Sequence, residues 1–319
     1  MNDRKGNGIE FVAGIDGGGT KTRVLCWNLD GKKLSSKQFG AFNLNSIGDK
    51  AFESLLDRIC LYITSVGTCK ALCIGAAGIS NKKMEKLIAV HMKQFGIHNW
   101  RLVGDHEIAL CGALDGKGGI GLIAGTGSIC FGKSATGLFE RAGGWGHLIG
   151  DEGSGYGLGR DALAAVARAY DGYGEPTLIQ ELLAQDMNLA SRAEIISYVY
   201  TKDKSAVAAI APIVEKACSQ GDKVAQCIVR KNAFSLVQLV EAVSCKLGVE
   251  KVCVAMLGGL LSHKTNLRAA FVAKLGEVDK NKICMDPIHD AATGAAMMAL
   301  EMLRCRVWIL VQAIRVQAI

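Results

Sequence analysis

Proline is scarce in this chain, with 3 residues among 319, so few rigid linkers are expected. The polar stretch 1–10 lacks the apolar core of a signal peptide, and no apolar run reaches the roughly 18 residues of a membrane span. The net charge is +7, but no block of basic residues with interleaved aromatics occurs. We therefore expect a cytoplasmic protein with neither a membrane nor a nucleic acid as partner.

The 12 cysteines form no disulfide or metal-binding pattern, because C-x-x-C does not occur. The closest pair is Cys69 and Cys73, which suits core or surface thiols better than ligands. Without a signal peptide, the cysteines are expected to be thiols of a reducing cytosol. His147 could suggest zinc, but no Cys-x-Cys cluster accompanies it, so a packed histidine is the favoured interpretation.

Glycine is abundant instead, with 39 residues, and two glycine loops follow apolar strands. A strand is expected at 11–16, then the loop GGGTK at 17–21 and a returning strand at 22–27. Because no helix follows the glycines directly, this opening is not a Rossmann unit. About a hundred residues later the order repeats around GTGS at 125–128. The repeated strand, glycine loop and strand predict two related halves.

The rest of the chain alternates between strands and helices, which favours mixed sheets covered by helices. The tail beyond Arg304 repeats VQAI at 311–314 and 316–319, either as an extension of the last helix or as a cloning or frame artefact. A further strand is expected soon after residue 31. The other expected strands are 71–75, 100–104, 119–124, 129–133 and 251–257, and the expected helices are 51–66, 81–95, 107–114, a mainly helical 161–248, and 290–303.

Asp16 ends the first expected strand directly before the glycines. A carboxylate there can hold Mg²⁺, directly or through water, while glycine N–H groups approach phosphate oxygens. A hairpin turn that happens to contain an aspartate is the alternative. The loop residues are Gly17, Gly18, Gly19, Thr20 and Lys21.

Two later segments add to these loops: GGWGHLIGDEGSGYGLG at 143–159, and a strand that ends in Gly258 and Gly259. Together with DGGGTK and GTGS, they resemble the N-acetylglucosamine kinase branch of the BadF/BadG/BcrA/BcrD ATPase family. The resemblance runs from about residue 11 to 300, and GGWGH-x-x-GDEGS is its most specific part. It implies an α/β fold of duplicated ribonuclease-H-like, actin-like ATPase domains around a central cleft.

The resemblance also implies a domain division, cofactors and partners. Residues 1–114, completed by a C-terminal helix at 292–319, would form the first domain, and 115–291 the second. The cofactors would be ATP and Mg²⁺, the partner a small-molecule amino sugar, and the assembly a homodimer.

The resemblance further implies roles for the matching residues. Asp16 and its loop would bind ATP phosphates and Mg²⁺, Asp105 would be the catalytic base, and Asn43 would bind the sugar. Trp145, Asp151 and the backbone of Gly144 would complete the sugar pocket. The second phosphate loop would be Gly125, Thr126, Gly127 and Ser128, and Gly258 and Gly259 would lie near the adenosine.

Physical chemistry supports these roles but leaves structural alternatives open. Phosphoryl transfer to a hydroxyl needs a carboxylate beside the attacking oxygen, although an aspartate before a helix, such as Asp105, is often an N-cap. Asp151 could cap a helix in the same way. Trp145 could stack on a sugar face or pack in a core, and Asn43 could be a turn residue.

The favoured function is a kinase for N-acetylglucosamine or N-acetylmuramic acid, acting at the 6-hydroxyl, with glucosamine as a rival substrate. One alternative is an ATPase that activates an iron–sulfur dehydratase or reductase, but only Cys130 lies near a position suited to a cluster. A sugar-sensing repressor is the other. The repressor is disfavoured because the carboxylate of Asp105 is present. It is also disfavoured because few residues precede the first strand, so we expect no DNA-binding domain there.

Overall fold

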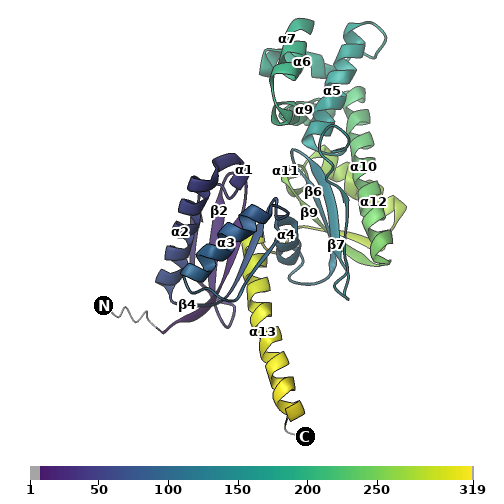
Figure 1. The fold of residues 1–319 in the computed structure, drawn as a ribbon. Coiled ribbons are helices and arrows are strands. Elements are labelled where there is room, and N and C mark those ends of the chain that lie inside the picture. Colours follow the sequence, from purple (N-terminus) through teal and green to yellow (C-terminus); the bar gives the residue numbers. More distant parts are fainter. Residues whose placement is uncertain (1–7, 318–319) are drawn as a thin grey trace. The chain divides into compact units, whose positions relative to one another are not determined.

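The structure, a computed structural model, describes the backbone of residues 8–317 and side chains up to Arg304 (Figure 1). The chain divides into two compact units, each described by itself below. Unit 1 comprises residues 1–117 and 288–319, and unit 2 comprises residues 118–287. Within the described residues no helix is both long and apolar enough to cross a membrane.

Unit 1 contains a five-stranded mixed sheet in the order β3-β2-β1-β4-β5. The first three strands form an antiparallel meander, and β4 and β5 run parallel to β1. The strands are β1 (Glu10–Gly17), β2 (Thr22–Asn28), β3 (Lys33–Phe39), β4 (Thr68–Ala76) and β5 (Trp100–Gly104). The carboxyl ends of the parallel strands therefore share one edge, where side chains following different strands can meet.

Helices cover both faces of this sheet, and the alternation of side chains along β1 shows which face is which. Phe11 and Ile15 pack with residues of α2 and α3, whereas Val12 packs with α13. Gly14 lies on the α13 face, where a Cβ would stand 2.2 Å from the backbone nitrogen of Ala296, so only glycine permits this contact. The helices are α1 (Leu44–Ile47), α2 (Asp49–Val66), α3 (Lys82–Gln94), α4 (Asp105–Ala113) and α13 (Ala291–Gln317).

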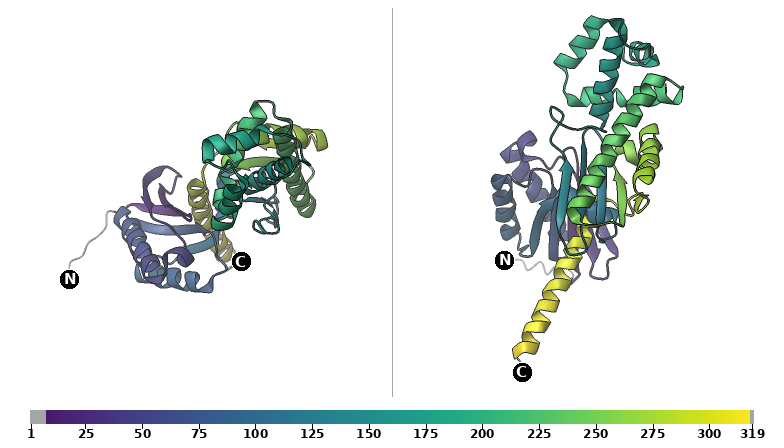
Figure 2. Two further views of the ribbon diagram at one scale, coloured as in Figure 1. Left: turned by 90° about the horizontal axis from the view of Figure 1, so that it is seen from above. Right: turned by 90° about the vertical axis from the view of Figure 1, so that its right-hand side faces the viewer.

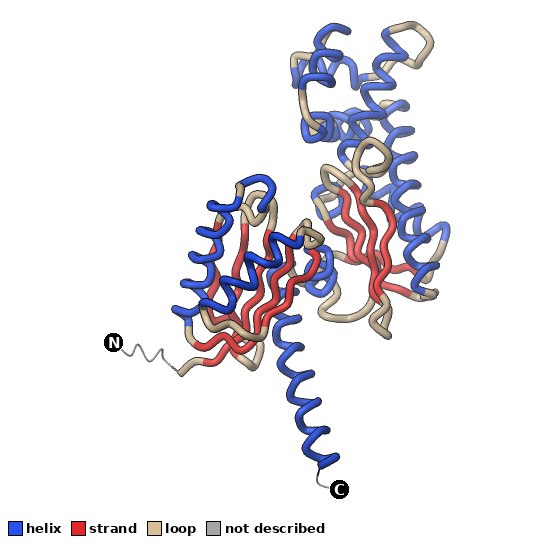
Figure 3. Tube along the Cα trace, in the orientation of Figure 1, coloured by secondary structure: helices blue, strands red, loops and turns tan. Residues whose placement is uncertain are grey.

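Unit 2 repeats the same strand order, β8-β7-β6-β9-β10, with the same antiparallel and parallel pairings. Figure 3 shows the strands of each unit as one sheet with helices against it. The strands are β6 (Gly119–Ala124), β7 (Ser128–Lys133), β8 (Phe139–Gly143), β9 (Val252–Leu257) and β10 (Lys282–Met285). The repeat confirms the duplicated α/β fold expected from the two glycine loops.

The helices of unit 2 form a lobe beyond the sheet and a layer against it. The long helix α10 runs along the sheet and packs beside α12, as both views of Figure 2 allow the reader to follow. The helices are α5 (Gly155–Tyr170), α6 (Leu178–Met187), α7 (Arg192–Thr201), α8 (Lys204–Ala208), α9 (Ala211–Ser219), α10 (Lys223–Leu247), α11 (Gly259–Ser262) and α12 (Asn266–Val278).

Each strand and helix expected from the sequence has a counterpart, while α1, α11, α12, β8 and β10 were not anticipated. Four of these five have at most five residues, too few to show a period. The backbone of α13 continues to Gln317, so the first VQAI lies in the last helix. The final two residues, 318–319, lie outside the described residues.

Candidate active site

The first glycine loop is a tight hairpin between β1 and β2, held at both ends by backbone contacts. The Gly18 N–H donates to the Lys21 carbonyl (3.0 Å), and the Phe42 N–H donates to the Gly18 carbonyl (2.9 Å). A Cβ on Gly17 would stand 2.8 Å from the Phe42 ring. Glycine at 17 therefore allows the segment 40–43 to lie directly against the loop, while Thr20 and Lys21 remain exposed.

Asp16 lies at the end of β1 and is partly buried. Its carboxylate makes no hydrogen bond or ion pair with any residue that the structure describes. Burial raises the pKa of this carboxyl, and the negative charges of Asp290 and Asp105 raise it further. Lys21 and Arg23 act in the opposite direction. These two cations do not offset the other effects, so an ionised Asp16 would gain from a further cation.

Asp105 is the first residue of α4, directly after β5, and the N-cap position belongs to Gly104. Its Oδ1 accepts the backbone N–H of His106 (2.9 Å) and lies 3.4 Å from Nδ1 of that histidine. These contacts with His106 lower the pKa of the Asp105 carboxyl, although burial opposes them. The side chain is 53% exposed, so an ionised carboxylate faces solvent at the same edge of the sheet as Asp16.

Asn43, predicted to bind sugar, is the N-cap of α1, and its side-chain oxygen accepts the N–H of Asn45 at 3.1 Å. Its neighbour Phe42 is hydrogen-bonded to Gly18, which places Asn43 next to the first glycine loop. The capping role agrees with the turn interpretation, and sugar binding stays a prediction.

The second glycine loop lies in unit 2, between β6 and β7. Gly155 and Tyr156, at the start of α5, donate their N–H groups to the carbonyls of Gly125 (2.7 Å) and Thr126 (3.2 Å). The N-terminal end of a 16-residue helix is thereby fixed against the loop. Because that end carries partial positive charge, it favours an anion such as phosphate nearby.

Gly258 lies against the end of β6, directly before the second glycine loop. It follows β9 with φ +83°, and a Cβ there would stand 2.4 Å from the Ala124 carbonyl oxygen. Both the left-handed backbone and the close approach require glycine. The structure therefore places Gly258 beside the residue that precedes Gly125 and Gly259 next along the chain, while the adenosine contact of the two glycines stays a prediction.

Asp151 is only 5% exposed and has a left-handed backbone, with φ +66°. Its Oδ1 accepts the Ser128 N–H (3.1 Å), and a Cβ on Gly127 would stand 2.8 Å from that oxygen. Its Oδ2 is buried without a hydrogen-bond partner among the described residues. The carboxylate thus holds the second loop, and one of its two oxygens has no partner among the described residues, while its sugar contact stays a prediction.

Trp145 is 70% exposed, which rules out the core-packing interpretation. Its neighbours Gly144 (φ +71°) and Gly146 (φ +84°) have backbone conformations that favour glycine. These glycines hold an aromatic ring in solvent, where it can stack on a flat apolar face such as that of a sugar. His147 packs edge-on against Tyr156, with ring centroids 5.0 Å apart, in agreement with the packed-histidine interpretation.

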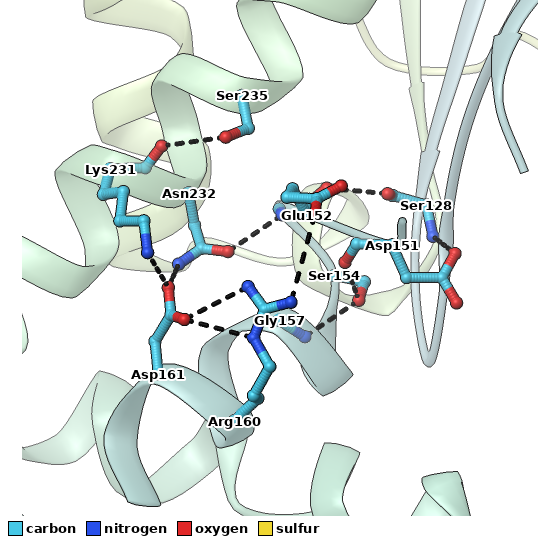
Figure 4. A network of polar contacts seen from close by, with 11 residues as sticks. Ser128, Asp151, Glu152, Ser154, Gly157, Arg160, Asp161, Lys231, Asn232 and Ser235 are labelled. Carbon is cyan, nitrogen blue, oxygen red and sulfur yellow. Dashed lines mark hydrogen bonds and ion pairs between the residues drawn. The ribbon is translucent and has the colours of Figure 1, made fainter. Parts of the chain in front are cut away.

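A buried polar network fixes the GDEGS segment from α10 (Figure 4). Asn232, 2% exposed, accepts the Gly153 N–H (2.8 Å) and donates to Asp161 Oδ2 (3.1 Å). Asp161 also binds Lys231 (3.0 Å) and Arg160 (3.1 Å). Asn232 therefore connects α10 to the loop that carries Asp151, a connection across 79 positions that no local pattern in the sequence signals.

Asn232→Leu is expected to lower the free energy of unfolding by about 1–3 kcal/mol, because the buried Gly153 N–H and Asp161 each lose a partner. Chemical denaturation of both proteins measures the difference. Ser235→Ala, on the same helix, is the matched control, since Ser235 is only partly buried and donates to the carbonyl of Lys231 on its own helix. Equal losses in the two variants would contradict a role for Asn232 in fixing the loop.

No three acidic, histidine or cysteine side chains among the described residues lie close enough to form a metal site on their own. A Mg²⁺ that serves ATP does not need one, because it keeps several waters and binds one or two carboxylates plus the phosphates. The unpartnered Asp16 beside a phosphate-type loop fits that mode of binding.

Comparison with known proteins decides the family. Residues 13–299 match the BadF/BadG/BcrA/BcrD ATPase family. The chain belongs to this family. The resemblance noted from DGGGTK, GTGS and the GGWGH segment is therefore confirmed.

Two proteins with similar sequences are named as amino-sugar kinases. The chain is 33% identical over 302 residues to the N-acetylmuramic acid/N-acetylglucosamine kinase of Clostridium acetobutylicum, covering 91% of this chain and 98% of that protein. It is 29% identical over 317 residues to the N-acetyl-D-glucosamine kinase of Dictyostelium discoideum, with the same coverage of each chain.

Two solved structures support the fold. A candidate N-acetylglucosamine kinase from Chromobacterium violaceum is 26% identical, with a TM-score of 0.70 over 91% of this chain and 99% of that chain. A ROK family glucokinase from Streptomyces griseus is 17% identical, with a TM-score of 0.53 over the same shares of the two chains, and shows the fold alone. The duplicated actin-like ATPase architecture is therefore confirmed.

Proposed function

We propose that this protein is an ATP-dependent kinase that transfers the γ-phosphoryl group to the 6-hydroxyl of N-acetylglucosamine or N-acetylmuramic acid. One observation carries the proposal: the half-exposed, ionised Asp105 shares an edge of the unit 1 sheet with the unpartnered Asp16. A base for a hydroxyl and a carboxylate for a cation thus lie together in a chain that is 33% identical to an amino-sugar kinase.

In this proposal Asp105 accepts the proton of the attacking hydroxyl as its oxygen bonds to phosphorus and ADP leaves. The carboxylate must be ionised to accept that proton, and the contacts with His106 that lower its pKa keep it so. Asp105 is the first residue of α4 and directly follows β5, which fixes its backbone. The carboxylate therefore has a defined direction from which it meets the hydroxyl.

The glycine loops would bind the phosphates through backbone N–H groups, with Lys21 adding positive charge at the first loop and the start of α5 at the second. Asp16 would hold Mg²⁺, directly or through water. A bound Mg²⁺ would offset the negative charge of the phosphates. Gly258 and Gly259 would contact the adenosine.

The sugar would be recognised by Asn43 and Trp145, by the backbone of Gly144, and by Asp151. The buried, unpartnered Oδ2 of Asp151 supports this assignment, because a sugar hydroxyl would satisfy it. The exposed indole of Trp145 supports stacking on the sugar ring.

The first test is release of ADP from Mg-ATP by the purified protein with N-acetylglucosamine, N-acetylmuramic acid, glucosamine or glucose, and without sugar. We expect release that depends on one or both N-acetylated sugars. Preference for glucosamine would replace the proposed substrate, and release without any sugar would remove the kinase assignment. Mass or NMR analysis of the product would identify the phosphorylated hydroxyl.

The iron–sulfur activator is a second candidate within the family, and Cys130 argues against it. The thiol is fully buried in β7, and burial raises its pKa well above the ordinary value. A cluster ligand must be an accessible thiolate, so Cys130 does not suit that role. Iron analysis of the purified protein would test this directly.

The location and assembly of the enzyme complete the proposal. No disulfide joins cysteines within the described part of the chain, which suits the reducing cytoplasm. A homodimer without a nucleic-acid partner stays a prediction, and light scattering of the purified protein would measure its mass in solution.

A further inference from the structure

Arg23 lies opposite an acidic residue, Asp16, but forms no ion pair with it. On the antiparallel pair β1 and β2, Asp16 and Arg23 are directly opposite and project from the same face. Opposite charges in this position normally attract each other. Arg23 instead forms an ion pair with Asp290, while the Asp16 carboxylate makes no ion pair with any described residue.

Backbone and capping contacts fix Asp290 in the position where it pairs with Arg23. It precedes α13, and its Oδ1 accepts the Thr293 N–H at 2.9 Å, as an N-cap does. The segment before it is bonded to the end of α4, since the His289 N–H donates to the Gly112 carbonyl at 3.1 Å. A Cβ on Gly112 would stand 2.3 Å from the Asp290 carbonyl oxygen, so the backbones are in direct contact.

Stability does not account for the pair between Arg23 and Asp290. Their side chains are 41% and 49% exposed, and ion pairs exposed to this degree contribute little to folding. The pair instead determines where the Arg23 charge lies, at the edge of the sheet where Asp16 and Asp105 are found.

We propose that Asp290 is a positioning residue for the metal-binding carboxylate. By holding the Arg23 guanidinium, it keeps that cation from pairing across the strands with Asp16, and so leaves Asp16 to a divalent cation bound with ATP. The inference rests on the proposed use of Mg-ATP, but not on which sugar is the acceptor. Asp290 also adds negative charge near Asp16, which acts in the same direction.

The test measures how strongly Mg²⁺ improves nucleotide binding. The affinity of a non-hydrolysable ATP analogue is determined by calorimetry in Mg²⁺ and in EDTA, without sugar, and the ratio of the two affinities gives the effect of the metal. Asp290→Asn keeps the N-cap acceptor and removes only the charge. We expect this variant to reduce the ratio by about tenfold or more, as loss of residues that orient metal ligands commonly does.

A second substitution separates this mechanism from a general loss of structure. In Asp290→Asn, the released Arg23 is expected to pair with Asp16, so the double variant Asp290→Asn/Arg23→Gln should return the ratio to near the wild-type value. Asp203→Asn makes the same chemical change at another N-cap, that of α8 in unit 2, and should leave the ratio unchanged.

An unchanged ratio in Asp290→Asn, or no recovery in the double variant, would overturn the inference. Equal losses of affinity in Mg²⁺ and in EDTA are one form of an unchanged ratio, and they would show that Asp290 has a purely structural role. Failure of the sugar kinase assignment would instead appear only in the assay of ADP release, so the two proposals can be told apart.

Discussion

Replacing Asp105 by asparagine is expected to lower kcat by about 10²–10⁴-fold while the affinity for ATP stays unchanged. Asparagine keeps the shape of the side chain and can still accept the His106 N–H, but it cannot take up a proton. The transition state therefore loses its base, whereas the phosphate loops are untouched. Steady-state kinetics with saturating sugar gives kcat, and calorimetry gives the nucleotide affinity.

The pH profile adds an independent check on the same residue. As pH falls through the pKa of Asp105 the base becomes protonated and activity is lost, and the contacts with His106 place that loss below the ordinary range of an aspartate. Asp30→Asn, in the turn after β2, changes an exposed carboxylate at the opposite end of the β1–β2 pair from Asp16 and is the control. Full kcat in Asp105→Asn would exclude Asp105 as the base.

Much of this arrangement could be read from the sequence, because local patterns determine it. The apolar run of β1 followed by glycines predicted the loop after Asp16, and the same order at GTGS predicted the duplication that the two sheets confirm. Asp105 was expected between a strand at 100–104 and a helix from 107, and the structure has it as the first residue of α4, directly after β5.

The residues that support these loops could not be found in the same way. Asn232 lies in the middle of a long helix, and only the folded structure brings it to Gly153, 79 positions away in the sequence. Asp290 likewise precedes α13 but pairs with Arg23 on β2. Sequence patterns report the neighbours along a strand or a helix turn, not partners that distant elements bring together. The exposure of Trp145 was equally open, because a tryptophan between glycines suits a core as well as a surface.

The buried Asp151 changes how the second loop is understood. The resemblance implied that Asp151 binds the sugar, with helix capping as the alternative, but its Oδ1 accepts the Ser128 N–H and lies over Gly127. One side chain thus shapes the phosphate loop, while its Oδ2 is buried without a hydrogen-bond partner among the described residues. If both proposed contacts are made, binding of the sugar and the geometry of the phosphate loop depend on the same carboxylate.

Gly127→Ala tests that arrangement and is expected to lower kcat/KM for ATP by about 10²-fold. The new Cβ would stand 2.8 Å and 2.9 Å from the two oxygens of Asp151, closer than real contacts allow. The carboxylate cannot move aside freely, because it is 5% exposed and bonded to Ser128. The loop must therefore shift, and its N–H groups lose their alignment with the phosphates.

Gly276→Ala, in the last turn of α12, is the matched control, since a Cβ there meets nothing within 4 Å and alanine favours the helix. Kinetics at varied ATP separates KM from kcat, and thermal unfolding of both variants shows whether the fold is kept. Wild-type kinetics in Gly127→Ala would mean that the Asp151 carboxylate moves aside and the loop stays in place, which would contradict the prediction. A selective loss at limiting ATP, with the fold intact, would show that Asp151 and Gly127 together define the second phosphate site.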